Sequence, residues 1–193
     1  GDVVLSTDDE KIYNLIKKLA LELMVRKKAF TAYGGNYSDY IKYSGKKLPS
    51  IVVIFNEMGI MNEIYNDIVD KYIPIIREGR KYGIYFLITG ETPSSIKSKV
   101  IQSCKNSLCL QLSNDNQYRD ILGKTGGIVP SRLLGRGLVK LENVCEFQTA
   151  TVSKDKIFYE FIKEYLPNLQ NKGYKKAPVI HVMPETVELE PMM

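Results

Sequence analysis

Asn56 and Glu57 form a polar pair directly after a run of five apolar residues, Ile51 to Phe55. In many ATP-driven motors a buried strand ends in Asp-Glu, and these carboxylates hold magnesium and the attacking water. Here an amide replaces the first carboxylate, so the size is kept and the negative charge is lost. Either this strand end still supports chemistry through Glu57, or Asn56 only caps the loop that follows the strand.

A nucleotide site of this kind also requires Gly-x-x-x-x-Gly-Lys-Ser/Thr, a loop whose backbone amides hold the phosphates. The chain has one Gly-Lys-Thr triplet, Gly123-Lys124-Thr125, but the first glycine of the motif would fall on Tyr118. The triplet also follows a predicted helix rather than a strand, so we interpret it as a helix C-terminus. We therefore expect no nucleotide cofactor in this fragment, and no hydrolysis of ATP by it.

The side chains that could bind a metal or act as a covalent nucleophile are few. Cys104, Cys109 and Cys145 form an odd set without a Cys-x-x-Cys motif, and His181 is the single histidine. These residues are too few for a zinc site, and they provide no base for a Cys-His pair. The composition predicts no metal site and favours reduced thiols in a cytosolic setting.

The charge of the chain predicts little affinity for nucleic acid. The formal net charge is +5, with 25% charged and 44% hydrophobic residues, which is ordinary for a globular domain. The lysines occur as separate pairs, for example Lys17-Lys18 and Lys46-Lys47, rather than as one stripe. Counterion release needs clustered cations, so solvated faces are the better interpretation and a nucleic-acid partner is unlikely on this ground.

Alternating strand and helix patterns predict an α/β fold with a mainly parallel sheet and helices on both faces. Thr7 and Glu10 have the spacing of a capping box before a helix that should end at Phe30, and Pro74 should kink or break a later helix. Because the run 51–55 is apolar throughout, we expect both faces of that strand to be covered. Further strands are expected at 84–88 and 107–112, a hairpin over 137–151, and a last helix over 157–165 that stops at Pro167.

The length of 193 residues fits one domain, which we place at residues 1–170. Residues 171–193 are rich in proline and acidic side chains, and we interpret them as an interdomain linker or tail. No apolar run approaches the ~20 residues of a membrane span, and the first residues do not begin a signal peptide.

Several stretches, taken together and in order, resemble the FtsK/SpoIIIE family of ring-forming ATPases. LPSIVVIFNEM resembles the family's Walker B strand, and IREGRKYGIYFLITGETPSS resembles its sensor strand, which usually ends in Thr-Gln-Arg-Pro. LQLSNDNQYRDILG and LLGRGLVKL resemble the arginine-bearing segment and the Gly-Arg-Gly turn. The ending KKAPVIHVMPETVEL is similar to the joint between tandem ATPase domains in the EssC/EccC proteins of type VII secretion.

The resemblance implies a RecA-like P-loop NTPase sheet that lacks its phosphate-loop strand in this fragment, and ATP with magnesium as the family's cofactors. It implies a degenerate site. Asn56 stands at the Walker B aspartate, Glu57 at the catalytic base, and Gly90, Glu91 and Thr92 at the sensor.

Arg119 and Arg136 match arginines that, in the family, lie near a subunit or domain interface. Salt bridges to a residue such as Asp115 or Asp120 are an alternative role for them.

The function implied is that of a degenerate ATPase module in a type VII secretion motor, which couples domains and regulates protein export rather than hydrolysing ATP by itself. The expected partners are neighbouring ATPase domains of the same chain, in a parent protein that is hexameric, and secreted small helical proteins. The expected place is the cytoplasmic part of a membrane-anchored bacterial protein. Two alternatives remain open: a substrate-binding module for export signals, and a DNA-translocase motor domain.

Overall fold

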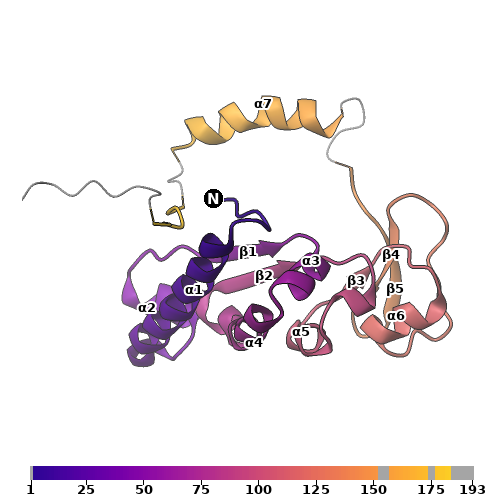
Figure 1. The fold of residues 1–193 in the computed structure, drawn as a ribbon, viewed down its shortest axis with the longest axis horizontal. Coiled ribbons are helices and arrows are strands. Elements are labelled where there is room, and N and C mark those ends of the chain that lie inside the picture. Colours follow the sequence, from indigo (N-terminus) through magenta and orange to yellow (C-terminus); the bar gives the residue numbers. More distant parts are fainter. Residues whose placement is uncertain (1, 152–156, 174–176, 184–193) are drawn as a thin grey trace, which may run out of the picture. The chain divides into compact units, whose positions relative to one another are not determined.

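The computed structural model describes residues 2–151, 157–173 and 177–183, which divide into two compact units. Of the described residues, unit 1 comprises 2–55, 63–87 and 177–183, and unit 2 comprises 56–62, 88–151 and 157–173. The elements, labelled in Figure 1, are α1 (Asp9–Phe30), η1 (Thr31–Tyr33), α2 (Tyr37–Ser44), β1 (Ile51–Phe55), α3 (Met58–Ile64), α4 (Asn66–Gly79), η2 (Arg80–Tyr82), β2 (Ile84–Ile88), η3 (Pro93–Ser95), α5 (Ser98–Ser103), β3 (Leu108–Cys109), α6 (Asp115–Leu122), β4 (Arg136–Lys140), β5 (Val144–Gln148) and α7 (Phe158–Asn171).

Unit 1 is built on the parallel pair β1-β2, with α1 and α4 packed against each other (Figure 1). Phe55 of β1 meets Tyr72 of α4 edge-on, with ring centroids 4.9 Å apart, so α4 covers one face of the sheet. Apolar residues at spacings of three and four on α1 and α4 turn inward, as predicted for amphipathic helices. The core contains Ile12, Ile16, Leu19, Leu23, Phe30, Val53, Phe55, Ile68, Val69, Tyr72, Ile75, Ile76 and Ile84.

The other face of β1 is open in this chain. Val53 and Phe55 are buried, whereas Val52 and Ile54 are 63% and 62% exposed. On β2, Leu87 is also exposed, at 54%. The prediction that both faces of the strand are covered is therefore wrong for the described residues, because the helices of unit 1 cover only one side of a two-stranded sheet.

Two local expectations about helix boundaries are also corrected. The N-cap of α1 is Asp8, with no side-chain cap hydrogen bond, so Thr7 and Glu10 do not form a capping box. Pro74 lies inside α4 and does not break that helix, so the expected kink there remains a prediction. Pro167 lies inside α7, which continues to Asn171 instead of stopping there. None of the described helices is long and apolar enough to cross a membrane.

Unit 2 contains an antiparallel sheet of order β3-β4-β5, against which α6 packs. Gly137 makes the close approach of β3 and β4 possible, because a Cβ there would lie 2.4 Å from the carbonyl oxygen of Cys109. A small core of Cys109, Tyr118, Leu122, Leu138 and Val144 holds the helix on the sheet. The third strand thus pairs with the hairpin, so the mainly parallel sheet expected from the sequence is limited to β1-β2.

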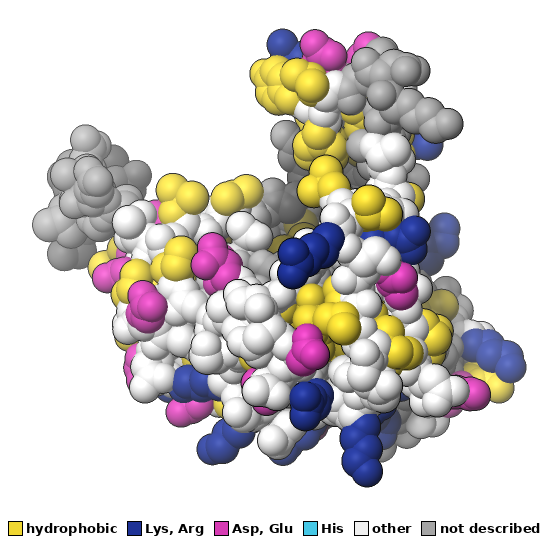
Figure 2. Space-filling view, turned by 90° about the vertical axis from the view of Figure 1, so that its right-hand side faces the viewer, with side chains coloured by type: hydrophobic (Ala, Val, Ile, Leu, Met, Phe, Trp, Pro, Cys, Tyr) yellow, Lys and Arg dark blue, Asp and Glu magenta, His cyan; other side chains and the backbone are white. Residues whose placement is uncertain are grey.

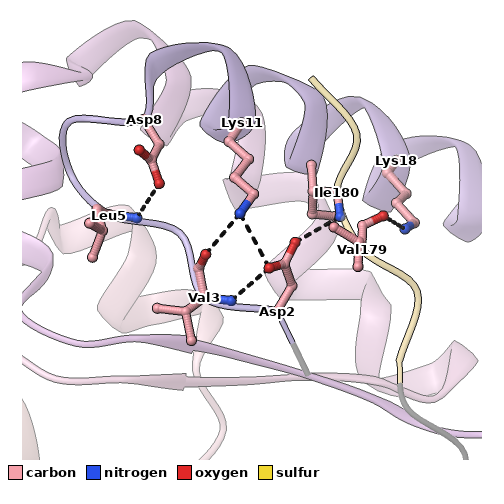
Figure 3. Close-up of polar contacts among 8 residues, drawn as sticks. All are labelled: Asp2, Val3, Leu5, Asp8, Lys11, Lys18, Val179 and Ile180. Carbon is pink, nitrogen blue, oxygen red and sulfur yellow. Dashed lines mark hydrogen bonds and ion pairs between the residues drawn. The ribbon is translucent and has the colours of Figure 1, made fainter. Parts of the chain in front are cut away.

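Residues 177–183, expected to be a linker, lie along α1 in unit 1, as Figure 3 shows in part. The Asp2 carboxylate accepts a hydrogen bond from the Ile180 N–H at 2.7 Å and an ion pair from Lys11 at 3.2 Å. Lys18 donates to the Val179 carbonyl, and the Ile180 side chain is buried. The boundary placed at residue 170 remains a prediction.

Candidate functional site

The polar residues that follow β1 and β2 come together within unit 2. The Glu57 N–H donates to the Thr89 hydroxyl at 3.0 Å, and that hydroxyl donates to the Asn56 side-chain oxygen at 3.3 Å. The N–H of Met58 donates to the Thr89 carbonyl at 2.8 Å. The carboxyl edge of parallel strands is where open α/β sheets place ligands. Asn56, however, is already bound to protein.

Glu57 is the one residue other than glycine with a positive φ among the described residues, at 62°. A left-handed conformation costs an L-residue roughly 1–2 kcal/mol and is found most often at turns and functional sites. Its carboxylate lies near Gly59, where an added Cβ would stand 3.2 Å from Oε1. The chain therefore turns sharply at Glu57 and places the carboxylate over the start of α3.

The three residues at the sensor position are used by a local turn. The Ser95 hydroxyl donates to the Thr92 carbonyl at 2.7 Å, and the Thr92 and Ser94 hydroxyls are 3.0 Å apart. A Cβ on Gly90 would lie 2.5 Å from the Ser95 hydroxyl, and Glu91 is exposed. These contacts build the entry to η3 rather than reaching the strand-end pair.

Thr89 is the residue that reaches Asn56 and Glu57, although no motif in the sequence pointed to it. A signal for it was present, because Thr89 is the first polar residue after the apolar strand 84–88. Strands that are parallel neighbours end at the same edge, so their first polar residues are expected to meet. We define the strand-end cluster as Asn56, Glu57 and Thr89.

Arg119 lies on α6 and lines a cavity of about 280 Å³ in unit 2. The same cavity is lined by Lys124, by Asp115 and by the glycines at 126 and 127. Within the described part of the chain, the guanidinium of Arg119 has no ion-pair partner, so the suggested bridges to Asp115 or Asp120 do not form there. The side chain is exposed and is free to contact another molecule.

Arg136 has a different environment, at the start of β4. Its Nη1 lies 3.8 Å from Oε2 of Glu146, and its Nε is buried without a hydrogen-bond partner among the described residues. The Ser131 N–H donates to Glu146 at 2.6 Å; the hydrogen bonds from Ser131, and then the charge of Arg136, hold the pKa of the Glu146 carboxyl below its usual value. Arg136 is not among the residues that line the cavity beside Arg119.

The strand-end cluster fits a magnesium ion poorly. Mg²⁺ is commonly held by one or two carboxylates together with substrate phosphates. The cluster offers the single carboxylate of Glu57 and an amide oxygen that already accepts from Thr89. Among the described residues there is no group of three or more His, Cys, Asp and Glu that could hold a metal.

No family model matches the chain, but known proteins do. The type VII secretion system protein EssC of Staphylococcus aureus is 24% identical over 192 residues, which is 94% of this chain and 13% of that protein. The solved structure of EssC (ATPases 2 and 3) from Geobacillus thermodenitrificans has a TM-score of 0.84 at 23% identity, and covers 93% of this chain and 35% of that one.

A third comparison concerns Thermomonospora curvata EccC (ATPases 2 and 3), solved in complex with a signal sequence peptide. Its TM-score is 0.75 at 18% identity, and the match covers 93% of this chain and 34% of that chain. The chain thus shares the fold of these EssC and EccC structures. The chain spans only about an eighth of the length of the EssC protein that it matches.

Proposed function

We propose that this chain, a homologue of the EssC and EccC type VII secretion proteins, is a degenerate ATPase module that couples domains and does not hydrolyse ATP itself. The observation that carries the proposal is the strand-end cluster. Asn56 stands where the motif needs a carboxylate, and its side-chain oxygen is held by Thr89. Glu57 supplies the one carboxylate of the cluster, and among the described residues no group of three or more His, Cys, Asp and Glu could hold a metal beside it.

We further propose that the sheet of this chain is an incomplete RecA-like sheet. The open face of β1 and β2 supports this proposal. Val52 and Ile54 expose apolar side chains that a neighbouring strand layer or helix would bury. We propose that other ATPase domains of the same parent protein are the partners. We also propose that the parent is a membrane-anchored hexamer, with this module on its cytoplasmic side.

Turnover is tested on the purified 193-residue chain in a steady-state ATPase assay with magnesium. We expect the wild type and the variant Glu57→Gln to give the same background rate, because neither has a positioned metal. Magnesium-dependent turnover that Glu57→Gln abolishes would show that the strand-end cluster is an active catalytic site, and would sink the proposal.

Arg119 is the residue that we propose for contact with a neighbouring domain. It is exposed, lines a cavity beside Lys124, and forms no ion pair in the described chain. A guanidinium supplied to a neighbour's phosphoryl group is worth ~10³-fold or more in rate. If it instead restrains the neighbour, its removal raises the rate.

The test is Arg119→Ala in the multi-domain parent protein, with ATPase rate and secretion as readouts. Arg136→Ala is the matched comparison, because Arg136 is held by Glu146. We expect Arg119→Ala to change turnover at least about tenfold, while Arg136→Ala acts mainly on folding stability. If both readouts of a folded Arg119→Ala protein stay within about twofold of wild type, this interface role is excluded.

A second candidate function, binding of export signals, is favoured by an exposed apolar segment in unit 2. Residues 128–134 include four exposed apolar side chains, and Leu134 is 99% exposed. Exposed apolar patches mark sites of protein interaction, and the related T. curvata EccC was solved with a signal sequence peptide. Titration of a labelled helical export-signal peptide tests this: saturable binding that Leu134→Asp weakens supports it, and no binding excludes it.

The DNA-translocase alternative has less support. Figure 2 shows lysine and arginine side chains scattered over the face in view, with hydrophobic side chains between them, rather than a basic stripe. We expect only weak duplex binding that disappears by physiological salt. Sequence-independent binding tighter than micromolar at that salt would favour the translocase instead.

A further inference from the structure

Unit 1 has a cavity of about 380 Å³ whose walls are strongly basic. It is lined by Arg77 in the last turn of α4, by Arg80 and Lys81 of η2, and by the first turn of α2 with its N-cap. Tyr85 of β2 completes the lining. Neither the strand-end cluster nor Arg119 contributes to it, so this cavity is separate from the sites described above.

The three cations that line the cavity have no counterion within the described part of the chain. No acidic side chain lines the cavity, and neither Arg77 nor Arg80 forms an ion pair there. The neighbouring carboxylate, Glu78, is bound by Lys27 instead. Two like charges three residues apart repel each other, and an anion in the cavity would relieve that repulsion.

The first turn of α2, which also lines the cavity, offers hydrogen-bond donors. In the first turn of α2, the Asn36 side chain accepts from the N–H of Asp39 at 3.0 Å, and the Asn36 carbonyl accepts from Tyr40. The N–H groups of Tyr37 and Ser38 have no acceptor among the described residues. Such free amides at a helix start are donors that suit an anion.

Contacts of Tyr37 hold the first turn of α2 in place beside the cavity. The Tyr37 hydroxyl donates to the Leu48 carbonyl at 2.6 Å. The Tyr37 ring lies against Gly83, where φ is 75° and an added Cβ would stand 2.5 Å from the ring. Phe30, which is fully buried, packs near the other side of the ring, with centroids 6.3 Å apart. The first turn of α2 is therefore fixed relative to the turn that carries Arg80 and Lys81.

We propose that this cavity binds a phosphate-bearing anion, held by Arg77, Arg80 and Lys81. Guanidinium groups match phosphate oxygens in pairs, and an ammonium adds a point charge. The amides of Tyr37 and Ser38 supply two further donors. The phosphate can belong to a nucleotide or to another organic phosphate, since the chemistry of the walls is the same for both. This inference does not depend on the proposed coupling function.

The probe is tripolyphosphate, titrated into the chain by calorimetry, with amide resonances recorded by NMR. We expect saturable binding that shifts the amides of Tyr37 and Ser38. The double variant Arg77→Glu/Arg80→Glu should raise Kd at least about tenfold, and Arg77→Ala/Arg80→Ala should raise it less. Arg132→Glu, a charge change at an exposed site in unit 2, should leave Kd within about twofold. Both reversed side chains are exposed, and circular dichroism checks that the variants fold.

Further titrations separate the outcomes. Equal affinity for ATP and tripolyphosphate supports a site for phosphate groups from any source, and tighter binding of ATP supports a nucleotide. A tetraglutamate peptide that binds as tightly as tripolyphosphate would overturn the proposal, because the cavity would then recognise charge alone. Binding that ignores Arg77 and Arg80, or that is lost on Glu57→Gln, would also overturn it. Absence of any shift at Tyr37 and Ser38 at millimolar probe would do the same.

Discussion

The short turn from Arg80 to Gly83 lies between two regions of unit 1. One contains a buried arginine with hydrogen-bond partners, and the other contains exposed cations without a carboxylate partner among the described residues. The backbone carbonyls of the turn at Tyr82 and Gly83 accept hydrogen bonds from Arg26, which is 2% exposed and also donates to the Pro49 carbonyl and to Glu22. The turn's own side chains, Arg80 and Lys81, line the basic cavity without a carboxylate partner in the described chain.

This difference shows that burial and hydrogen-bond partners, and not residue type alone, decide whether an arginine is needed for folding. Arg26 is a structural residue, because each of its three guanidinium nitrogens donates to an acceptor, and removing the side chain leaves buried polar groups without a partner. Arg80 is dispensable for folding by the same reasoning, since water satisfies it. A cation that is not needed for the fold, and that converges with others on a cavity, is available for a ligand.

The sharpest way to break the comparison is to remove each arginine in turn. Arg26→Ala should lower the free energy of unfolding by about 3 kcal/mol, because carbonyls at Tyr82 and Pro49 lose a buried donor. Arg80→Ala should change it by less than about 0.5 kcal/mol. Urea denaturation followed by circular dichroism measures both. Equal losses for the two variants would mean that Arg80 has a structural role that the contacts do not show.

A substitution at Gly83 tests the contact between the turn 80–83 and the Tyr37 ring beside the basic cavity. Gly83→Ala should cost about 2 kcal/mol, from a left-handed backbone and from a Cβ that collides with the Tyr37 ring. Gly45→Ala is the matched control, since Gly45 has φ 67° and open space around it, and should cost only the backbone strain of about 1 kcal/mol. Gly83→Ala should also weaken tripolyphosphate binding. If the variant loses stability but binds tripolyphosphate as tightly as wild type, the position of Tyr37 does not matter for the anion site.

The sequence predicted the elements of this fold better than their assembly. The periodicity of α1 and the apolar runs of β1 and β2 located those elements to within about a residue, because local burial determines such patterns. It did not predict that β3, two residues long, pairs with β4 in an antiparallel sheet, since pairing depends on a close approach at Gly137. Nor did it predict the open face of β1, because an apolar strand looks the same whether its second cover is present or absent.

The candidate site shows the same division. Asn56 and Glu57 were located by a motif, but Thr89 was not, since its role arises from the pairing of two strands distant in sequence. Arg119 and Arg136 looked equivalent in the sequence, and only the contact of Arg136 with Glu146 separates them. The basic cavity had no signal at all, because its walls come from α2 and from the end of α4, roughly forty residues apart along the chain.

Glu57 extends the comparison of partnered and unpartnered groups to backbone conformation. Its φ of 62° is strained for a glutamate, and we expect Glu57→Gly to raise the free energy of unfolding by about 0.5–1 kcal/mol. Glu57→Ala removes the carboxylate and keeps the strain, so it should leave stability nearly unchanged. If Glu57→Gly destabilises the chain, the carboxylate contributes a contact that outweighs the strain.

The smallest expected effect concerns the segment 177–183. There the Asp2 carboxylate at the surface has hydrogen-bond partners, as buried Arg26 has in the core. The hydrogen bond from the Ile180 N–H, with the nearby Lys11, keeps the pKa of the Asp2 carboxyl below its usual value. A depressed pKa in the folded state means that the contact stabilises fully above the ordinary carboxyl pKa of about 4 and is lost as pH falls through the lower, folded value.

Amide hydrogen exchange of Ile180 in the range of about pH 7 to 3 measures this contact, after correction for the intrinsic pH dependence of exchange. We expect protection of the Ile180 N–H to fall on the acid side, while the amide of Ile51, which donates to the backbone carbonyl of Gly83, keeps its protection. Asp2→Asn retains an acceptor oxygen but does not titrate, so its Ile180 protection should lose this acid step. If the acid step persists unchanged in Asp2→Asn, another titrating group causes it. The contact with Asp2 would then not be what protects the Ile180 N–H from exchange.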